Sequence, residues 1–319
     1  MTPERPNQVS VIDPISPAIE RAKVMLFKPF DLGKWFAIGF CAWLAYLGSG
    51  GGGNGGFQGH EPYKSQEQRA KIAEAVNSTK EYLLHNLSWI IPLAVIVVVL
   101  IIGIGLLIAW LNSRGQFMFL HCVAENKSEV KNPWHKFKTH GNSLFLFRIV
   151  LGLIGFAVVA VPIMGIVLLI IMMVAKAVTA IVFVPIIIML GLIVFVLAIA
   201  LTLVRKFTFD FVVPIMFLRT ASCTTGWREF LTILSVNKAS FALYILFQIV
   251  LSIAIGTIVF IGFCIGCCFC CVSLLLFIIS LFSLHYLGTV ILLPLLVFKR
   301  AYSLYYLRQF GPGFDVFSI

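Results

Sequence analysis

The chain has 319 residues, of which 60% are hydrophobic and 12% are charged, and its mean hydropathy is +1.02. Soluble domains are about 45–50% apolar and about 25% charged, so this composition excludes a soluble enzyme, a disordered protein and a secreted disulfide module. The net charge of +11 would suggest nucleic acid in a soluble protein, but in a polytopic membrane protein it is expected from basic cytosolic loops.

The polar N-terminal segment lacks the apolar core of a signal peptide, so we expect it to be retained. An amphipathic helix is predicted over residues 17–28, with Ser16 as its cap and Pro17 at its first position. We expect this helix to lie at the membrane interface with one apolar face, formed by Ala18, Ala22, Met25 and Leu26.

Six apolar runs are candidates to cross a bilayer core about 30 Å thick, which takes about 20 helical residues. The third and fourth runs are separated by little more than Lys176, which predicts a tight hairpin. Pro162 and Pro185 should kink these two helices, and Pro294 lies near the end of the sixth. The predicted spans are residues 33–48, 88–111, 144–174, 177–204, 240–261 and 272–298.

The basic residues predict how these spans are oriented. With six spans, 19 Lys and Arg residues fall on the side of the two termini and 5 on the other side. By the positive-inside rule, both termini are cytosolic. We expect the chain to lie in the cytoplasmic (inner) membrane. The predicted fold is therefore an all-α transmembrane bundle, six spans in three hairpins, with amphipathic interfacial helices. Topology accounts for the basic excess, so we expect no nucleic acid partner and a weak attraction to anionic headgroups.

An extracytosolic segment over residues 49–87 follows the first span. Residues 48–59 carry 8 Gly in 12 positions, which is typical of a flexible linker or of backbone that re-enters the headgroup zone. The segment has no GK[ST] ending, so it is no phosphate-binding P-loop. An amphipathic helix is predicted over residues 65–87, with Ser65 and Gln68 as its capping box.

The cytosolic segments share a layout in which an apolar, aromatic helix precedes a Trp flanked by basic residues. These are Trp35, Trp134 and Trp227, each ahead of an odd-numbered span, where Trp and basic residues act as interfacial anchors. In the third segment, Asp210 pairs with Arg205 or Arg228, either as a surface ion pair or as a clamp for a phosphate headgroup. A last aromatic cytosolic helix, from Tyr302 to Phe310, is ended by Gly311-Pro312-Gly313.

Several stretches together resemble one family: PFDLGKWFAIGF with the Gly run, RGQFMFLHCVAENK, PWHKFKTHGNSLFLFR and YLGTVILLPLLVFKRAYSLYYLRQFGP. It is a family of uncharacterised bacterial and archaeal polytopic membrane proteins, distantly similar to the membrane domain of glycerophosphodiester phosphodiesterases. The resemblance covers most of the chain and implies a membrane fold with no known activity. It does not imply the hydrolase reaction, because the catalytic domain of those enzymes is a soluble barrel with a metal site that this chain does not encode.

Five cysteines lie in the stretch GFCIGCCFCC between the fifth and sixth spans. On a helix, four of them share one face, which leaves three interpretations: close helix packing beside the GxxxG of Gly262 and Gly266, a disulfide or thiol redox pair, or a zinc or iron–sulfur site. We expect the isolated Cys41, Cys122 and Cys223 to be structural. The four on one face are Cys264, Cys267, Cys268 and Cys271.

His285 lies in the middle of the sixth span, and an ionisable residue at that depth is a candidate functional site. We expect it either to be a neutral His hydrogen-bonded to Gln248 or Tyr244 of the fifth span, or to contact a ligand. Ser283 is two residues away on a different face, which argues against an intramembrane hydrolase. No Asp or Glu falls inside a predicted span, which disfavours proton-coupled transport.

These patterns predict a non-enzymatic protein without a cofactor, a scaffold or accessory subunit. Its expected partners are membrane lipids, other membrane proteins or a second copy of the chain. The alternative is a transporter or channel for a small neutral or lipidic solute, which uses the kinks at Pro162 and Pro185.

Overall fold

The computed structural model describes residues 9–48, 85–174, 180–269, 286 and 288–318, and every regular element within them is a helix. This confirms the all-α class. The chain divides into two compact units, one formed by residues 47–111 and the other by the remaining residues. The predicted Gly-rich loop and most of the helix over residues 65–87 lie outside the described residues.

Four described helices are long and apolar enough to cross a membrane, which indicates a membrane protein. They correspond to the second, third, fourth and fifth predicted spans. The first predicted span is the helix α2 (Leu32–Tyr46), whose 15 residues extend only about 22 Å. Most of the sixth lies outside the described residues, so six spans in three hairpins stays a prediction. The four candidates are Ser88–Glu125, Lys138–Met173, Phe183–Arg219 and Lys238–Ile258.

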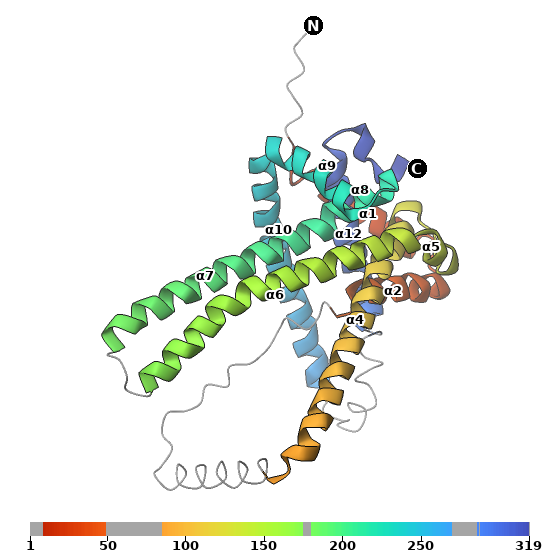
Figure 1. Cartoon of the computed structure of the whole chain (residues 1–319). Coiled ribbons are helices and arrows are strands. Elements are labelled where there is room, and N and C mark those ends of the chain that lie inside the picture. The colour runs from red at the N-terminus through yellow and green to blue at the C-terminus, as the bar shows by residue number, and fades with distance from the viewer. Residues whose placement is uncertain (1–8, 49–84, 175–179, 270–285, 287, 319) are drawn as a thin grey trace. The chain divides into compact units, whose positions relative to one another are not determined.

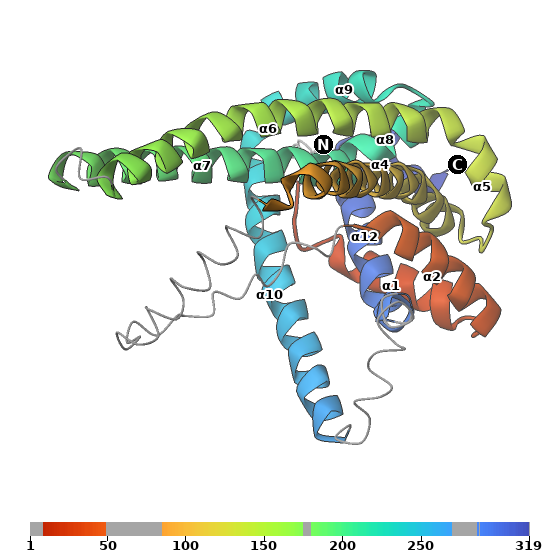
Figure 2. The same ribbon diagram turned by 60° about the horizontal axis from the view of Figure 1, so that its bottom comes forward.

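Helices α6 (Lys138–Val174) and α7 (Ala180–Phe207) lie side by side along their length in both views (Figures 1 and 2). Gly155 lets them approach, because its missing side chain leaves room for Leu201 of the other helix. Most other large apolar side chains of this pair are exposed, among them Phe156 at 76%. A surface of this kind is compatible with hydrocarbon and not with water.

Two helices continue well past the ends of the predicted spans. Helix α4 (Leu87–Glu125) runs beyond residue 111, and its residues 112–124 are all buried. Helix α7 runs beyond residue 204, through one π-helical turn, η2 (Thr208–Val212), into α8 (Val213–Arg219). The apolar runs that define the predicted spans end at the first polar or charged residues, but the helices do not end there.

Short helices pack around these extensions. Helix α1 (Ile15–Phe27) lies against α12 (Leu293–Arg308), and it buries the predicted apolar face of Ala18, Ala22, Met25 and Leu26. The predicted start of α1 was wrong: its cap is Pro14 rather than Ser16. Pro294 also differs from the prediction, since it occupies the first turn of α12, where a missing N–H costs little.

Helix α9 (Cys223–Val236) begins at Ser222, whose hydroxyl accepts a hydrogen bond from the Thr225 amide, a regular N-cap. Its buried Phe230 ring stacks on Phe211 of η2 at 5.4 Å between centroids. Phe241 and Tyr244 of α10 (Lys238–Phe269) lie against the same Phe211 ring, at 5.1 and 4.9 Å. This aromatic cluster joins α9, α10 and η2 where α7 leaves its exposed stretch.

Candidate functional site

A buried polar network surrounds Asp210, whose residue is 3% exposed in the π turn. Lys206 Nζ lies 2.8 Å from Asp210 Oδ2, and the Tyr244 hydroxyl donates to the same oxygen at 3.0 Å. Gln248 closes the network, because its Nε2 donates to the Tyr244 hydroxyl at 3.2 Å and its Oε1 accepts from Lys206 at 3.4 Å. Asp210 is thus a buried acid with a Lys partner four residues earlier, not a surface ion pair with Arg205 or Arg228.

The π turn explains how Arg300 of α12 joins this region. In such a turn each amide donates to the carbonyl five residues earlier, as Val213 does to Thr208. The next residue is Pro214, which has no N–H to give to the carbonyl of Phe209. Arg300 supplies the missing donor: its Nη1 donates to the Phe209 carbonyl at 2.6 Å, and its guanidinium lies 4.5 Å over the Phe209 ring.

The rest of the Arg300 guanidinium has no hydrogen-bond partner among the described residues. The residue is 1% exposed, and both Nε and Nη2 are buried and unbonded. Burial lowers the pKa of Arg300, and the nearby Tyr46, Asp210 and Tyr244 act in the opposite direction. A buried donor without a partner costs about 1–3 kcal/mol, more for a charged group, so these atoms call for an explanation.

Lys299 adds another cation. Burial lowers its pKa, the like charge of Lys206 lowers it further, and the carboxylate of Asp210 raises it. The carboxylate of Asp210 thus raises the pKa of both Lys299 and Arg300. We call Lys206, Asp210, Lys299 and Arg300 the cluster. Its three cations and one acid give it a net charge of +2, and such a charge is costly away from water.

A second polar network joins α4, α6 and α2. Arg148 of α6 donates from Nη1 to Asn112 Oδ1 and, at 3.3 Å, to the Ser113 hydroxyl. Asn112 in turn donates to the Ala45 carbonyl of α2 at 2.7 Å. Its members are satisfied by one another, so this network reads as structural support for the close packing of α4 on α2.

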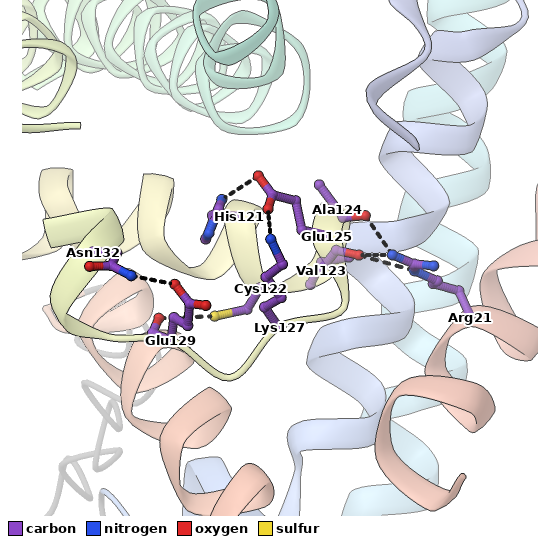
Figure 3. A network of polar contacts seen from close by, with 9 residues as sticks. All are labelled: Arg21, His121, Cys122, Val123, Ala124, Glu125, Lys127, Glu129 and Asn132. Atoms are coloured by element: carbon purple, nitrogen blue, oxygen red, sulfur yellow. Dashed lines mark hydrogen bonds and ion pairs between the residues drawn. The ribbon is translucent and has the colours of Figure 1, made fainter. Parts of the chain in front are cut away.

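The end of α4 is held by a third network, shown in Figure 3. Asn126 adopts a left-handed conformation with φ +57°, which is the usual way to terminate a helix. Arg21 of α1 donates to the carbonyls of Val123 at 2.9–3.0 Å and Ala124 at 2.5 Å, which satisfies groups that a helix end leaves unbonded. Figure 3 also shows a local chain of contacts in which Glu125 pairs with His121 at 2.9 Å and Lys127 at 2.8 Å.

An open groove of about 560 Å³ runs between α6 and α9. Phe147, Trp227 and Leu231 provide its apolar walls, and Leu231 is 50% exposed. Arg228 lies in the same groove. An apolar trough with a cation along it suits an amphipathic molecule.

The sequence-predicted residues have mixed outcomes. The structure brings Tyr244 and Gln248 together, while His285, their predicted partner, lies outside the described residues. In the cysteine cluster, Cys264, Cys267 and Cys268 belong to α10, but their side chains lie outside what the structure describes, as does Cys271. Packing, redox pair and metal site therefore all remain open as interpretations. Cys41, Cys122 and Cys223 are buried free thiols.

Sequence reasoning missed Lys206, Lys299 and Arg300 as members of a site. Lys206 and Asp210 have the i,i+4 spacing of a helical ion pair, and this signal was visible once the helix was allowed to continue. Asp210 lies in the candidate helix Phe183–Arg219 but beyond residue 204, where the predicted span ends, so the predicted absence of acids from the spans stays a prediction. Arg300 gives no local signal, since its partner Phe209 is 91 residues away.

The chain belongs to a family described as a family of unknown function (DUF7544), whose model matches residues 9–307. No curated protein and no solved structure matches it. The expected likeness to glycerophosphodiester phosphodiesterases finds no support in these comparisons.

Proposed function

We propose that the protein is a non-enzymatic scaffold or accessory subunit of the cytoplasmic (inner) membrane that binds lipid or a larger membrane complex. The observation that carries the proposal is the abrupt change along α7, α6 and α10 from exposed apolar residues to a packed, cation-rich unit. Such a unit lies where acyl chains give way to headgroups, and it offers both apolar and basic surfaces to them.

The topology is part of the proposal: six spans in three hairpins, with both termini and the cation-rich unit in the cytosol. The 19 to 5 distribution of Lys and Arg supports this orientation. A reporter fused after Ile319 tests it directly. Cytosolic activity of the reporter is expected, and activity on the outer side would overturn the arrangement.

Purification from native membranes in a mild detergent tests the function. Native mass spectrometry of the full chain should find retained lipid or a co-purifying protein. Leu231→Asp, which places a charge in the groove between α6 and α9, should lower retention, whereas Val236→Asp, 79% exposed on the same helix but outside the groove lining, should not. A bare monomer without lipid or partner would overturn the proposal.

The alternative is a transporter or channel for a small neutral or lipidic solute. The network of Asp210, Tyr244 and Gln248 favours it, because buried polar groups on membrane helices commonly line solute pathways and π turns are frequent at functional sites. Liposomes that contain the protein would then show glycerol flux or lipid scrambling above empty liposomes. That activity should fall in Gln248→Leu; flux equal to empty liposomes rejects this function.

A further inference from the structure

The two unbonded donors of Arg300 lie on the same edge of its guanidinium. Nε–H and one N–H of Nη2 point in parallel, as a fork that matches two oxygens of one oxyanion. The third nitrogen, Nη1, is already committed to the Phe209 carbonyl at 2.6 Å. The Nε–Nη2 edge is therefore a complete bidentate donor, and the bond of Nη1 to Phe209 fixes its position. The residue as a whole is 1% exposed.

The protein itself does not supply an acceptor for this fork among its described residues. Asp210 raises the pKa of Arg300, but it accepts no hydrogen bond from Nε or Nη2; its Oδ2 accepts from Lys206 at 2.8 Å and from Tyr244 at 3.0 Å. Lys206 pairs with this same acid, and Lys299 directly precedes Arg300 on α12. The net charge of +2 is the complement of a bound anion that carries one or two negative charges.

The depth of the cluster indicates which anion meets it. The exposed stretch of α7 from Phe183 to Val204 has 22 residues and is about 33 Å long, which already covers a hydrocarbon core of about 30 Å. Lys206 follows two residues later, at the level of lipid phosphates. Its side chain is 33% exposed, so the cluster is accessible from outside at Lys206.

We propose that Arg300, Lys299 and Lys206 form a binding site for a phosphate group, an inference that rests on the proposed lipid-binding function and gives it a chemical target. Arg300 grips two phosphate oxygens with Nε and Nη2, and the two lysines neutralise the remaining charge. The phosphate belongs either to an anionic phospholipid that enters from the membrane or to a free phosphate from the cytosol.

The test measures thermal unfolding of the full chain in two arms. In the first arm, sodium phosphate is compared with sodium chloride at equal ionic strength. In the second arm, nanodiscs of phosphatidylglycerol are compared with nanodiscs of phosphatidylcholine. Wild type should be stabilised by the phosphate group in at least one arm. Arg300→Gln should weaken that response at least about tenfold in apparent affinity. Arg308→Gln is the matched control, because Arg308 lies on the same helix, 53% exposed and paired with Asp315 at 3.0 Å.

Two further variants keep the test decisive if Arg300→Gln does not fold. Lys299→Gln should weaken the response, and Asp210→Asn should strengthen it, since the competing carboxylate charge is removed. A response to phosphate and to phosphatidylglycerol indicates a general phosphate site, and a response to the lipid alone indicates a headgroup site. An unchanged or weaker response in Asp210→Asn overturns the proposal.

The outcomes also separate this inference from the proposed function. If phosphatidylglycerol stabilises wild type, Arg300→Gln and Lys299→Gln equally, lipid binds elsewhere and only the phosphate site is rejected. If neither phosphate nor lipid stabilises the wild type, the donors of Arg300 are satisfied by water alone. That result overturns the phosphate site and also removes the support for the proposed lipid binding.

Discussion

One helical run crosses two different surroundings in this protein. From Phe183 to Val204 its residues are exposed or partly exposed, with Phe195 at 62%, whereas every residue from Asp210 to Phe217 is buried. Both stretches are rich in Val, Ile and Phe. The difference lies in what each stretch faces: the first turns an apolar surface outward, which suits hydrocarbon, and other helices surround the second. Hydropathy alone does not separate a lipid-facing helix from a core helix, but the polar residues between them do.

The largest expected effect compares two phenylalanines of this run. Phe211→Ala removes a fully buried ring that lies against Phe230, Phe241 and Tyr244, and should lower the free energy of unfolding by about 3–5 kcal/mol. Phe195→Ala should change it by less than about 0.5 kcal/mol. Denaturation of the purified protein in detergent measures both, and equal losses would contradict the distinction between the two stretches.

A charge tests what surrounds the exposed stretch. Leu192→Arg places a cation where the side chain is 60% exposed, and should cost about 3 kcal/mol of insertion if hydrocarbon surrounds it. Leu231→Arg, at 50% exposure on α9 beside the predicted interface, should insert normally. Carbonate extraction of membranes gives the inserted fraction. Normal insertion of Leu192→Arg would show that water, not lipid, covers α7.

A methyl group tests the closest packing inside the compact unit. A Cβ at Gly115 of α4 would lie 2.5–2.6 Å from backbone atoms of Leu44 and Ala45, so Gly115→Ala should destabilise by about 1–3 kcal/mol. Gly152→Ala on α6 meets no atom within 4 Å and should be neutral or slightly stabilising. Thermal unfolding in detergent compares them; a neutral Gly115→Ala would disprove the tight contact of α2 with α4.

The smallest effect concerns one hydrogen bond at the base of α10. The Tyr306 hydroxyl donates to the Ser240 carbonyl at 2.8 Å, so Tyr306→Phe should lower the free energy of unfolding by about 1 kcal/mol. In the neighbouring Tyr305 the ring stacks on Phe317 at 4.3 Å. Tyr305→Phe keeps that ring stacking and should lower the free energy of unfolding by less than Tyr306→Phe. A denaturant titration measures both variants. A larger loss in Tyr305→Phe would argue against the hydrogen bond from Tyr306 to Ser240.

The sequence predicted what depends on local pattern. Uninterrupted apolar runs located the four candidate spans, and helical periodicity located the buried face of α1, because both signals lie within one segment. The ends of α4 and α7 were not predictable in this way. Asn112 and Lys206 look like helix ends in sequence, but each is bonded by another helix, so the backbone continues through them.

The candidate site follows the same division. Tyr244 and Gln248, four residues apart on one helix, were predicted as one polar site and do bond one another. Arg300 was not, because its place depends on Pro214, which leaves a carbonyl open on a distant helix. Long-range bonds of this type arise from the folded arrangement and leave no spacing in the chain.

The uninterrupted passage of α7 through η2 into α8 has a mechanical consequence. A rod of this kind acts as a lever, with one arm in the acyl chains and the other in the protein. Because no loop lies between the two arms, a tilt of the exposed arm would move α8 and the helices packed on it.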